Sequence, residues 1–304
     1  MAHFSRLRLL SRHLHPQATS NRVAGVFNSS LQRRFASSAG ETGDTVITER
    51  QDNIFLVGIN RPNSRNAVNR QTALLLRSAF EEFDKDHSLS VAVFYGVGGN
   101  FCAGMDLKEV SSYQDFDLKE VRLDPQGPMG PTKMTLSKPV IAAVSGYAVA
   151  GGMELALICD MRVVEKSATF GIFNRRFGIP LIDGGTVRLP KLIGLSRALD
   201  LILTGRPVGA EEAYSFGLAN RVVPDGEALD HAILLAKQIA AFPQGCMKTD
   251  RRSAYNSSFD SSTFQDALHY EFDTGSEVLS TESLPGATQF VKGMGRGGSF
   301  ESKE

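Results

Sequence analysis

Apolar residues lie along the chain in short runs, each followed by a turn and then by a segment with helical spacing. Residues 45–60 predict a hairpin that ends in the apolar run 54–57, and the run 140–144 predicts a buried strand. Between these two, apolar residues recur at helical spacing over 70–84, with Asn69 as the predicted N-cap. Strand, turn and helix recur at about 45-residue spacing, which favours stacked repeats over a conventional open α/β sheet.

Two of the turns share one design and lie 46 residues apart, at Met105 and Gly151. Each leads from an apolar strand through glycine into the start of a helix, whose first N–H groups have no intrahelical acceptor. Such an end favours an anionic or polarised oxygen. Glu154 lies in the first turn of the second helix, so an acid or base would adjoin an oxyanion site, which is a catalytic arrangement. The alternative is that the glycines serve packing and Glu154 only complements the helix dipole.

Four stretches of the chain resemble the enoyl-CoA hydratase/isomerase (crotonase) superfamily. The similarity runs in order from about Thr45 to about Pro224 and more loosely to the C-terminus. The stretches are RPNSRNAVN (61–69), FCAGMDLKEV (101–110), KPVIAAVSGYAVAGGMELALICD (138–160) and SATFGIFNRRFGIPLIDGGTVRLPKLIG (167–194). Several ordered motifs at family spacing are far more specific than any single glycine turn.

The resemblance implies a fold class and a division of the chain into a core and a C-terminal region. We expect an α/β protein with a crotonase-type β-β-α spiral core over residues 41–238. A C-terminal helical region over 239–304 is expected to cover the active site and to build a homotrimer, or a hexamer as a dimer of trimers. No run of 18 apolar residues is present, so we expect no transmembrane helix.

The resemblance also implies roles for residues at the two turns. The backbone N–H groups of Met105 and Gly151 would form an oxyanion hole for the thioester oxygen, and Glu154 would be the acid/base. The loops that follow the first strand and the first turn would bind the CoA thioester through Arg65, Ala67, Ala103, Asp106, Leu107 and Lys108. On a C-terminal helix, Lys248, Arg251 and Arg252 would meet CoA phosphates or be solvated.

The chain departs from typical hydratases where they place a second glutamate, because that position holds Asn174. An amide can orient a water molecule but is not a general base near neutral pH. Asp183 is a possible replacement, since some dienoyl-CoA isomerase relatives have a catalytic aspartate in this loop; its alternative role is to cap the helix that begins near Gly184. Arg175 and Arg176 would suit a carboxylate-bearing acyl group; the alternative is a solvated or subunit-facing ion pair.

Residues 1–40 have a composition unlike the rest of the chain. They hold six arginines, no lysine and no acid, with many serines, which is typical of a mitochondrial transit peptide, disordered and removed in the matrix. A disordered basic arm is the alternative. Removing six arginines from 33 basic residues leaves 27 against 33 acids, so the remainder carries a charge of about −6. Neither this negative charge nor the zero net charge of the full chain favours nucleic-acid binding.

Residue types that hold metals or form disulfides show no organised spacing. The three cysteines, Cys102, Cys159 and Cys246, have no CxxC pattern and suit a reducing compartment, and the six histidines have no metal-ligand spacing. We therefore expect no metal and no cofactor other than the CoA carried by the substrate. Cys102 adjoins the first turn but has no histidine partner in the motifs, so packing is its expected role.

Taken with the resemblance, these residues predict an enzyme, a hydratase-like lyase of fatty acid metabolism that adds water to a 2-enoyl-CoA. Its partner would be an acyl-CoA thioester. Double-bond isomerisation, dehydration of a hydroxyacyl-CoA and decarboxylation are alternatives, because all use an enolate in the same hole. A non-catalytic acyl-CoA-binding protein is a further alternative, consistent with the missing second glutamate.

Overall fold

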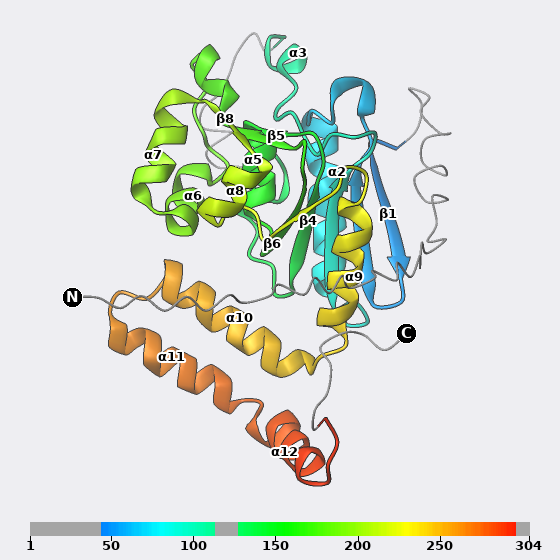
Figure 1. Ribbon diagram of the computed structural model, residues 1–304, viewed down its shortest axis with the longest axis vertical. Helices are drawn as coiled ribbons and strands as arrows, with labels where there is room; N and C mark the ends of the chain where they lie inside the picture. The colour runs from blue at the N-terminus through cyan, green and yellow to red at the C-terminus, as the bar shows by residue number, and fades with distance from the viewer. Residues whose placement is uncertain (1–43, 113–126, 296–304) are drawn as a thin grey trace, which may run out of the picture.

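The computed structural model describes residues 44–112 and 127–295, which form an α/β body with helices α10–α12 extending from one end (Figure 1). The predicted transit peptide lies outside the described residues, as does part of the polar segment between residues 111 and 135. In the part of the chain that is described, no helix combines the length and apolarity needed to cross a membrane.

The larger sheet holds the strands that the apolar runs predict. Its order is β1 (Val46–Gln51), β2 (Ile54–Ile59), β3 (Val91–Gly96), β4 (Val140–Val144), β6 (Met161–Glu165) and β9 (Arg221–Val223). The β1–β2 pair is the predicted antiparallel hairpin, and every later pair is parallel. Strands β2 and β4 are buried at every position, as expected where both faces of a parallel sheet are covered.

The repeated strand–turn–helix units form a spiral, because they also contribute to a second, smaller sheet. It consists of β5 (Tyr147–Val149), β7 (Thr169–Gly171) and β8 (Pro207–Gly209), and single bridges at Cys102–Ala148 and Val68–Met105 continue it. Successive turns of the chain thus add one strand to the large sheet and one short extended segment to the second layer. The apolar pattern does not predict β5, because three residues are too few to show a periodicity.

Helices cover both faces of the large sheet. In the core they are α2 (Arg70–Lys85), α3 (Leu107–Val110), α5 (Gly151–Leu157), α6 (Gly185–Ile193), α7 (Leu195–Thr204), α8 (Ala210–Phe216) and α9 (Ala228–Ala240). Short 3-10 turns lie at Pro62–Ser64, Pro131–Lys133 and Phe173–Phe177. Helix α9 packs against β3, β4 and β6 on the face opposite α2 and α5, so each face has its own apolar core.

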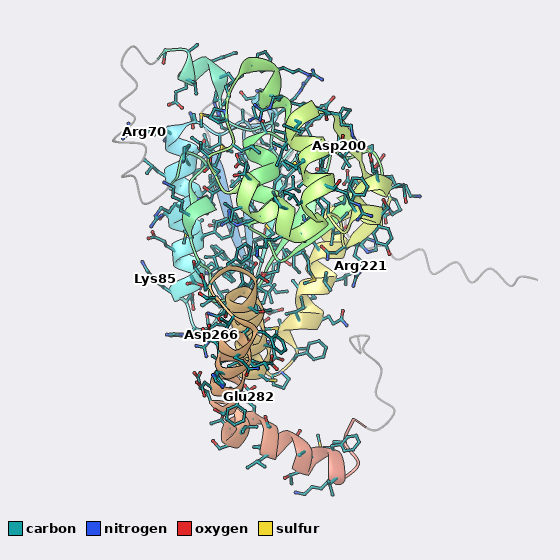
Figure 2. All side chains as sticks on the ribbon, turned by 90° about the vertical axis from the view of Figure 1, so that its left-hand side faces the viewer. Arg70, Lys85, Asp200, Arg221, Asp266 and Glu282 are labelled. Carbon is teal, nitrogen blue, oxygen red and sulfur yellow. The ribbon has the colours of Figure 1, made fainter. Side chains whose placement is uncertain are left out.

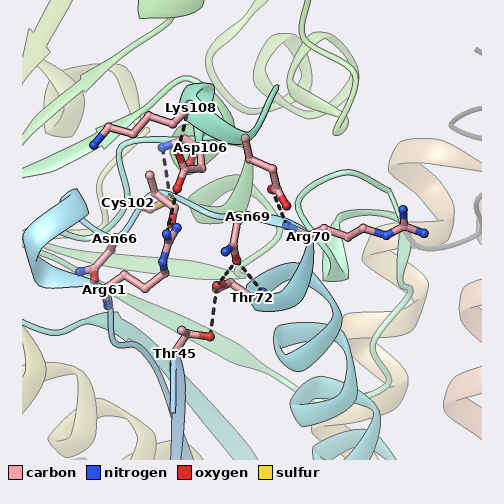
Figure 3. Close-up of polar contacts among 12 residues, drawn as sticks. Thr45, Arg61, Asn66, Asn69, Arg70, Thr72, Cys102, Asp106 and Lys108 are labelled. Carbon is pink, nitrogen blue, oxygen red and sulfur yellow. Dashed lines mark hydrogen bonds and ion pairs between the residues drawn. The ribbon is translucent and has the colours of Figure 1, made fainter. Parts of the chain in front are cut away.

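The first helix confirms its predicted cap and apolar face. The side chain of Asn69 accepts a hydrogen bond of 2.9 Å from the N–H of Thr72 at the start of α2 (Figure 3). At the other end, the buried ammonium of Lys138 donates to the carbonyls of Phe83, Asp86 and Leu89. A cation on these carbonyls satisfies groups that the end of a helix leaves unpaired.

The C-terminal helices form a separate arm. They are α10 (Gln244–Phe259), α11 (Phe264–Ser276), the π-helical turn Leu279–Ser283 and α12 (Leu284–Val291), and Figure 2 shows Asp266 and Glu282 below the body that holds α2. The boundary predicted at 238–239 falls inside α9, which packs on the core, and α10 follows the break at Pro243.

Candidate active site

A strained turn begins α5. Ala150 has φ 52° and ψ −127°, a conformation that a residue with a Cβ holds only when its surroundings fix it. Its N–H donates to the carbonyl of Gly171 at 2.8 Å, and its carbonyl accepts from Met153 at 3.0 Å. The next N–H, that of Gly151, has no acceptor among the described residues. The turn therefore presents an N–H group that is available to a ligand.

A second available N–H lies at Met105. Val68 forms a parallel bridge here, accepting from Asp106 at 2.8 Å and donating to Gly104 at 2.8 Å. In a parallel bridge the central residue turns its own N–H away from the partner strand. The N–H of Met105 accordingly has no acceptor among the described residues.

The two turns touch each other. A Cβ added at Gly104 would lie 3.1 Å from the nitrogen of Gly151 and 3.0 Å from the Cβ of Ala150. One added at Gly152 would lie 2.1 Å from the carbonyl oxygen of Cys102, so this approach requires glycine. The available N–H groups of Met105 and Gly151 thus lie on adjoining turns, an arrangement that can hold one oxygen between them.

Glu154 is buried one helical turn after Gly151, with only 3% of its surface exposed. Its Oε1 atom accepts hydrogen bonds from the N–H groups of Asp183 at 3.0 Å and Gly185 at 2.8 Å, whereas its Oε2 atom accepts none from a described residue. Burial, and next the nearby charge of Asp183, raise the pKa of Glu154 to about 7. Such a carboxyl group can both take up and release a proton near neutral pH.

Asp183 does not cap α6, so that interpretation is wrong. The N-cap of α6 is Gly184, in a left-handed conformation and without a side-chain cap. The Oδ1 atom of Asp183 instead accepts from the N–H of Met129 at 3.1 Å and from the hydroxyl of Thr132. Burial raises the pKa of Asp183, while these two hydrogen bonds act in the opposite direction. The side chain thereby joins the loop before α6 to the segment that precedes β4.

Asn174 is buried in the 3-10 turn Phe173–Phe177 and has a fixed orientation. Its Nδ2 atom donates to the carbonyl of Ile179 at 2.7 Å, and a carbonyl can only accept, so Nδ2 must face it. The Oδ1 atom is buried and accepts no hydrogen bond from a described residue. Asn174 therefore keeps an unoccupied acceptor at the position where the resemblance implies a second glutamate.

An ion pair ties the two predicted substrate loops together (Figure 3). The Arg61 guanidinium donates to Asp106 Oδ2 at 2.8 Å and to the carbonyl of Ala67, and Asp106 Oδ1 accepts from the N–H of Lys108 at 3.1 Å. Asn66, in a left-handed conformation, donates to the carbonyls of Val97 and Asn100. Asp106 thus has a structural role in this loop, and Arg61 and Asn66 are supporting residues that sequence analysis missed.

The other predicted substrate-binding residues lie around these loops. Arg65 and Lys108 are exposed, as is Leu107, and Ala67 and Ala103 are half-buried. The N–H of Ala103 donates to the carbonyl of Arg65 at 3.0 Å, which brings the loops side by side. The Arg65 guanidinium lies 5.5 Å from the ring centroid of Tyr147.

Met129 lies beside the site, and sequence analysis missed it. A Cβ added at Gly151 would lie 2.7 Å from its sulfur atom, so Met129 packs directly on the turn that presents the N–H group. It is fully buried. No periodicity or motif marks this methionine, because its place depends on the contact between Asp183 and the Met129 N–H.

The remaining candidates have structural partners or are exposed. Arg251 pairs with Asp160 at 2.8 Å and Arg252 with Glu277 at 2.8 Å. Arg175 and Arg176 are exposed beside the 3-10 turn that holds Asn174. Burial raises the pKa of Cys102 to about 12, which suits the expected packing role. Within residues 44–112 and 127–295, no three His, Cys, Asp or Glu side chains gather as a metal site.

Comparison with known families identifies the group to which this arrangement belongs. The model of the enoyl-CoA hydratase/isomerase family matches residues 49–294. The chain belongs to this family. It is 38% identical over 208 residues to enoyl-CoA hydratase EchA19 of Mycobacterium tuberculosis, covering 66% of this chain and 76% of that protein. It is 36% identical over 195 residues to 2,3-dehydroadipyl-CoA hydratase of Escherichia coli, covering 64% and 75%.

Solved structures agree with the family. The crystal structure of an enoyl-CoA hydratase from Mycobacterium tuberculosis has a TM-score of 0.75 and 36% identity, covering 82% of this chain and 96% of that chain. The predicted crotonase-type α/β fold is confirmed, as is the resemblance that led to it. The protein is an enzyme of the hydratase/isomerase type that acts in acyl-CoA and fatty acid metabolism.

Proposed function

We propose that the protein hydrates a 2-enoyl-CoA to a 3-hydroxyacyl-CoA. One observation above all supports this: a buried carboxyl group with a pKa of about 7, Glu154, lies one helical turn from the available N–H of Gly151. A proton carrier near an oxyanion site is what addition of water to a conjugated thioester requires.

In the proposed reaction, Glu154 takes a proton from water as the water oxygen bonds to C3 of the substrate. The electron pair of the double bond moves toward the thioester oxygen, which the N–H groups of Met105 and Gly151 stabilise. Each such donor contributes about 2.7 to 4 kcal/mol of transition-state stabilisation. Glu154 then returns the proton to C2, so that one water has been added and no proton is gained or lost.

Asn174 has a positioning role in this proposal. Its Oδ1 atom, which lacks a donor, would accept the second O–H of the attacking water. A single ionising carboxyl group then suffices, because the proton that Glu154 takes from water is the one that it later donates.

The test follows loss of the conjugated enoyl-thioester absorbance when residues 41–304 are given crotonyl-CoA. We expect the wild type to consume the substrate and Glu154→Gln to be slower by a factor of about 10² to 10⁴ while still binding CoA thioesters. A fully active Glu154→Gln variant would overturn the assignment of Glu154.

A second candidate is double-bond isomerisation, which one observation favours: Glu154 has no basic or acidic partner at position 174. Isomerisation moves one proton between two carbons, so a lone carboxyl group suffices. Products from 3-enoyl-CoA and 2-enoyl-CoA substrates separate it from hydration, and 3-hydroxyacyl-CoA and carboxylated substrates test dehydration and decarboxylation. Binding of thioesters without turnover of any of them would indicate the non-catalytic alternative.

We also propose that the chemistry needs neither metal nor redox cofactor, since the thioester accepts the electron pair. Retention of activity after dialysis against a chelator tests this.

We propose the mitochondrial matrix as the compartment, from the composition of residues 1–40. The measurement is the N-terminal sequence of the protein recovered from mitochondria, with a cut expected after the Arg33-Arg34 pair; an uncleaved cytosolic protein contradicts it.

The proposed assembly is a homotrimer, or a hexamer built of two trimers. Large apolar side chains are exposed along the C-terminal arm, among them Phe264, Phe272 and Val291. Exposed apolar surface of this kind is typical of subunit contacts. Light scattering after size-exclusion chromatography measures the mass directly.

A further inference from the structure

Two segments that are far apart in the sequence meet at the side chain of Asp183, which is buried. Its Oδ1 atom accepts hydrogen bonds from the N–H of Met129 at 3.1 Å and from the hydroxyl of Thr132. Met129 and Thr132 lie in the segment that precedes β4, whereas Asp183 lies in the loop that precedes α6. One buried carboxylate oxygen therefore holds the segment 127–132 at two points.

The backbone of this segment fits closely around the carboxylate. Gly127 and Gly130 have φ values of 72° and 90°, in the left-handed region that favours glycine. A Cβ at Gly127 would lie 3.1 Å from Asp183 Oδ1. One at Gly130 would overlap the carbonyl oxygen of Ala73 in α2. The segment is thus enclosed between Asp183 and α2, and this enclosure fixes the residue between the two glycines, Met129.

The loop that holds Asp183 has two further contacts with its surroundings. The Arg188 guanidinium donates to the carbonyl of Asp183 at 3.1 Å and to that of Thr132 at 2.8 Å, so the loop and the segment are joined a second time. The N–H of Asp183 donates to Oε1 of Glu154 at 3.0 Å. The backbone of Asp183 therefore orients the proposed acid/base, while its side chain orients the segment that contains Met129.

The side chain of Met129 packs on the turn that presents the Gly151 N–H. A Cβ at Gly151 would lie 2.7 Å from the Met129 sulfur atom and 3.0 Å from its Cε atom. The turn contains Ala150 in a conformation that persists only where its surroundings fix it. Gly171 and Gly104 contact the turn through their backbones, and Met129 contacts it through its side chain. Met129 is thereby one of the residues that fix the direction of the Gly151 N–H.

We propose that Asp183 is a positioning residue for the oxyanion hole, because it fixes Met129 against the turn and Met129 in turn fixes the Gly151 N–H. The inference rests on the proposed function for the placement of a thioester oxygen at this N–H. Asp183 would act through Met129 and without contact with the substrate, whereas Glu154 exchanges the proton. Displacement of an aligned group by about 1 Å can lower a rate about 10²-fold, so a residue outside the chemistry can control it.

The carbonyl stretching band of bound butyryl-CoA, labelled with ¹³C at the thioester carbon, reports on the hole without turnover. A hydrogen bond to the carbonyl oxygen lowers the frequency, so we expect the band of the wild-type complex below that of the free thioester. Asp183→Ala should move the band back toward the free value and lower kcat for crotonyl-CoA at least about tenfold. Calorimetry should show that this variant still binds butyryl-CoA, because its CoA-binding loops are unchanged.

Asp183→Asn separates the two hydrogen bonds from the negative charge, because the amide oxygen can still accept from Met129 and Thr132. This variant should keep the wild-type band and most of kcat when rates are compared at pH 9, where Glu154 is ionised. An Asn variant as impaired as the Ala variant would mean that the carboxylate itself takes part in turnover, and would overturn the positioning role.

Variants of Met129 test whether Asp183 acts through it. Met129→Ala should shift the band and lower kcat as Asp183→Ala does, and Met129→Leu should retain both because it nearly conserves the volume. The double variant Asp183→Ala/Met129→Ala should be no more impaired than either single variant, since both remove the same contact with the turn. Additive losses in the double variant would contradict the inference.

Asp84 provides the matched control, because its Oδ1 atom also accepts from one N–H and one hydroxyl, both of Ser137, shortly before β4. Asp84→Ala should lower stability without moving the band or kcat. A band shift in this control, or an unshifted band in Asp183→Ala, would overturn the inference. Band shifts as expected in an enzyme that hydrates no thioester would reject the proposed function alone, whereas full hydration by Asp183→Ala would reject the inference alone.

Discussion

The N–H of Gly185 donates a hydrogen bond of 2.8 Å to the Oε1 atom of Glu154, which is 31 residues earlier in the chain. The N–H of Asp183 donates to the same oxygen at 3.0 Å. One carboxylate oxygen is thereby held by backbone groups, and Oε2 is the oxygen left to exchange a proton. These two bonds favour the ionised form, yet burial and Asp183 act more strongly and raise the pKa.

The pH dependence of activity follows from this pKa. As a general base Glu154 must be ionised, so kcat/KM for hydration should rise with pH through about 7 and then reach a plateau. The profile should show a single ionisation, since Asn174 does not titrate. Initial rates between pH 5 and 9 provide the measurement. A second ionisation on the alkaline side would indicate another catalytic group.

Stability should depend on pH through the same residue. The pKa of Glu154 is raised in the folded protein from 4.5 to about 7. Its protonated form therefore favours folding below pH 4.5, and this contribution is lost as pH rises through 7. Glu154→Gln, which stays neutral and keeps an acceptor for the Gly185 N–H, should be more stable than the wild type at pH 8 by up to about 3 kcal/mol. Urea unfolding at pH 4 and pH 8 measures the difference, which should nearly vanish at pH 4.

Asn174 separates positioning from proton transfer. Asn174→Ala removes the acceptor and should lower kcat about tenfold, the equivalent of one hydrogen bond, without moving the ionisation of Glu154. Asn174→Glu should add a second ionisation to the pH profile of kcat/KM. An Asn174→Ala variant with unchanged kcat would show that the buried Oδ1 has no part in turnover.

Gly152 should not tolerate a side chain, because a Cβ would lie 2.1 Å from the carbonyl oxygen of Cys102. Gly152→Ala should destabilise the fold by about 1 to 3 kcal/mol, a typical cost of overpacking, and should separate the two turns. Loss of thioester binding along with stability checks the second effect. Gly209→Ala is the matched control, since nothing lies within 4 Å of a Cβ there and its φ is −78°. Equal stability of the two variants would contradict the contact between the turns.

Lys138 should stabilise the end of α2. Lys138→Met removes the donor to three carbonyls and leaves them in a buried place, which should cost about 3 kcal/mol in the free energy of unfolding. Lys85→Met, at an exposed lysine on the same helix, should cost little. Thermal unfolding of both variants is the measurement. A similar loss for both would mean that the buried ammonium has no special role.

Local pattern accounts for much of the fold. The strands 54–59 and 140–144 are runs of apolar residues that can only be buried, and the cap at Asn69 depends on residues within one helical turn. The two glycine turns were predictable because each lies between a buried strand and a helix, and the available N–H of Gly151 follows from that order. Glu154 was predictable for the same reason. The available N–H of Met105 instead depends on the bridge to Val68, which only the folded chain forms.

Contacts between distant segments account for the rest. From its neighbours in sequence Asp183 is either a catalytic carboxylate or a helix cap, whereas its partners Met129 and Thr132 are more than 50 residues away. Likewise, the raised pKa of Glu154 arises from burial and from the charge of Asp183, and neither is visible in its own helical turn. Periodicity in the sequence shows which face of a helix or strand is buried. The electrostatic environment of a residue and the cavities beside it depend on which distant segments pack against that face, and only the folded chain determines this.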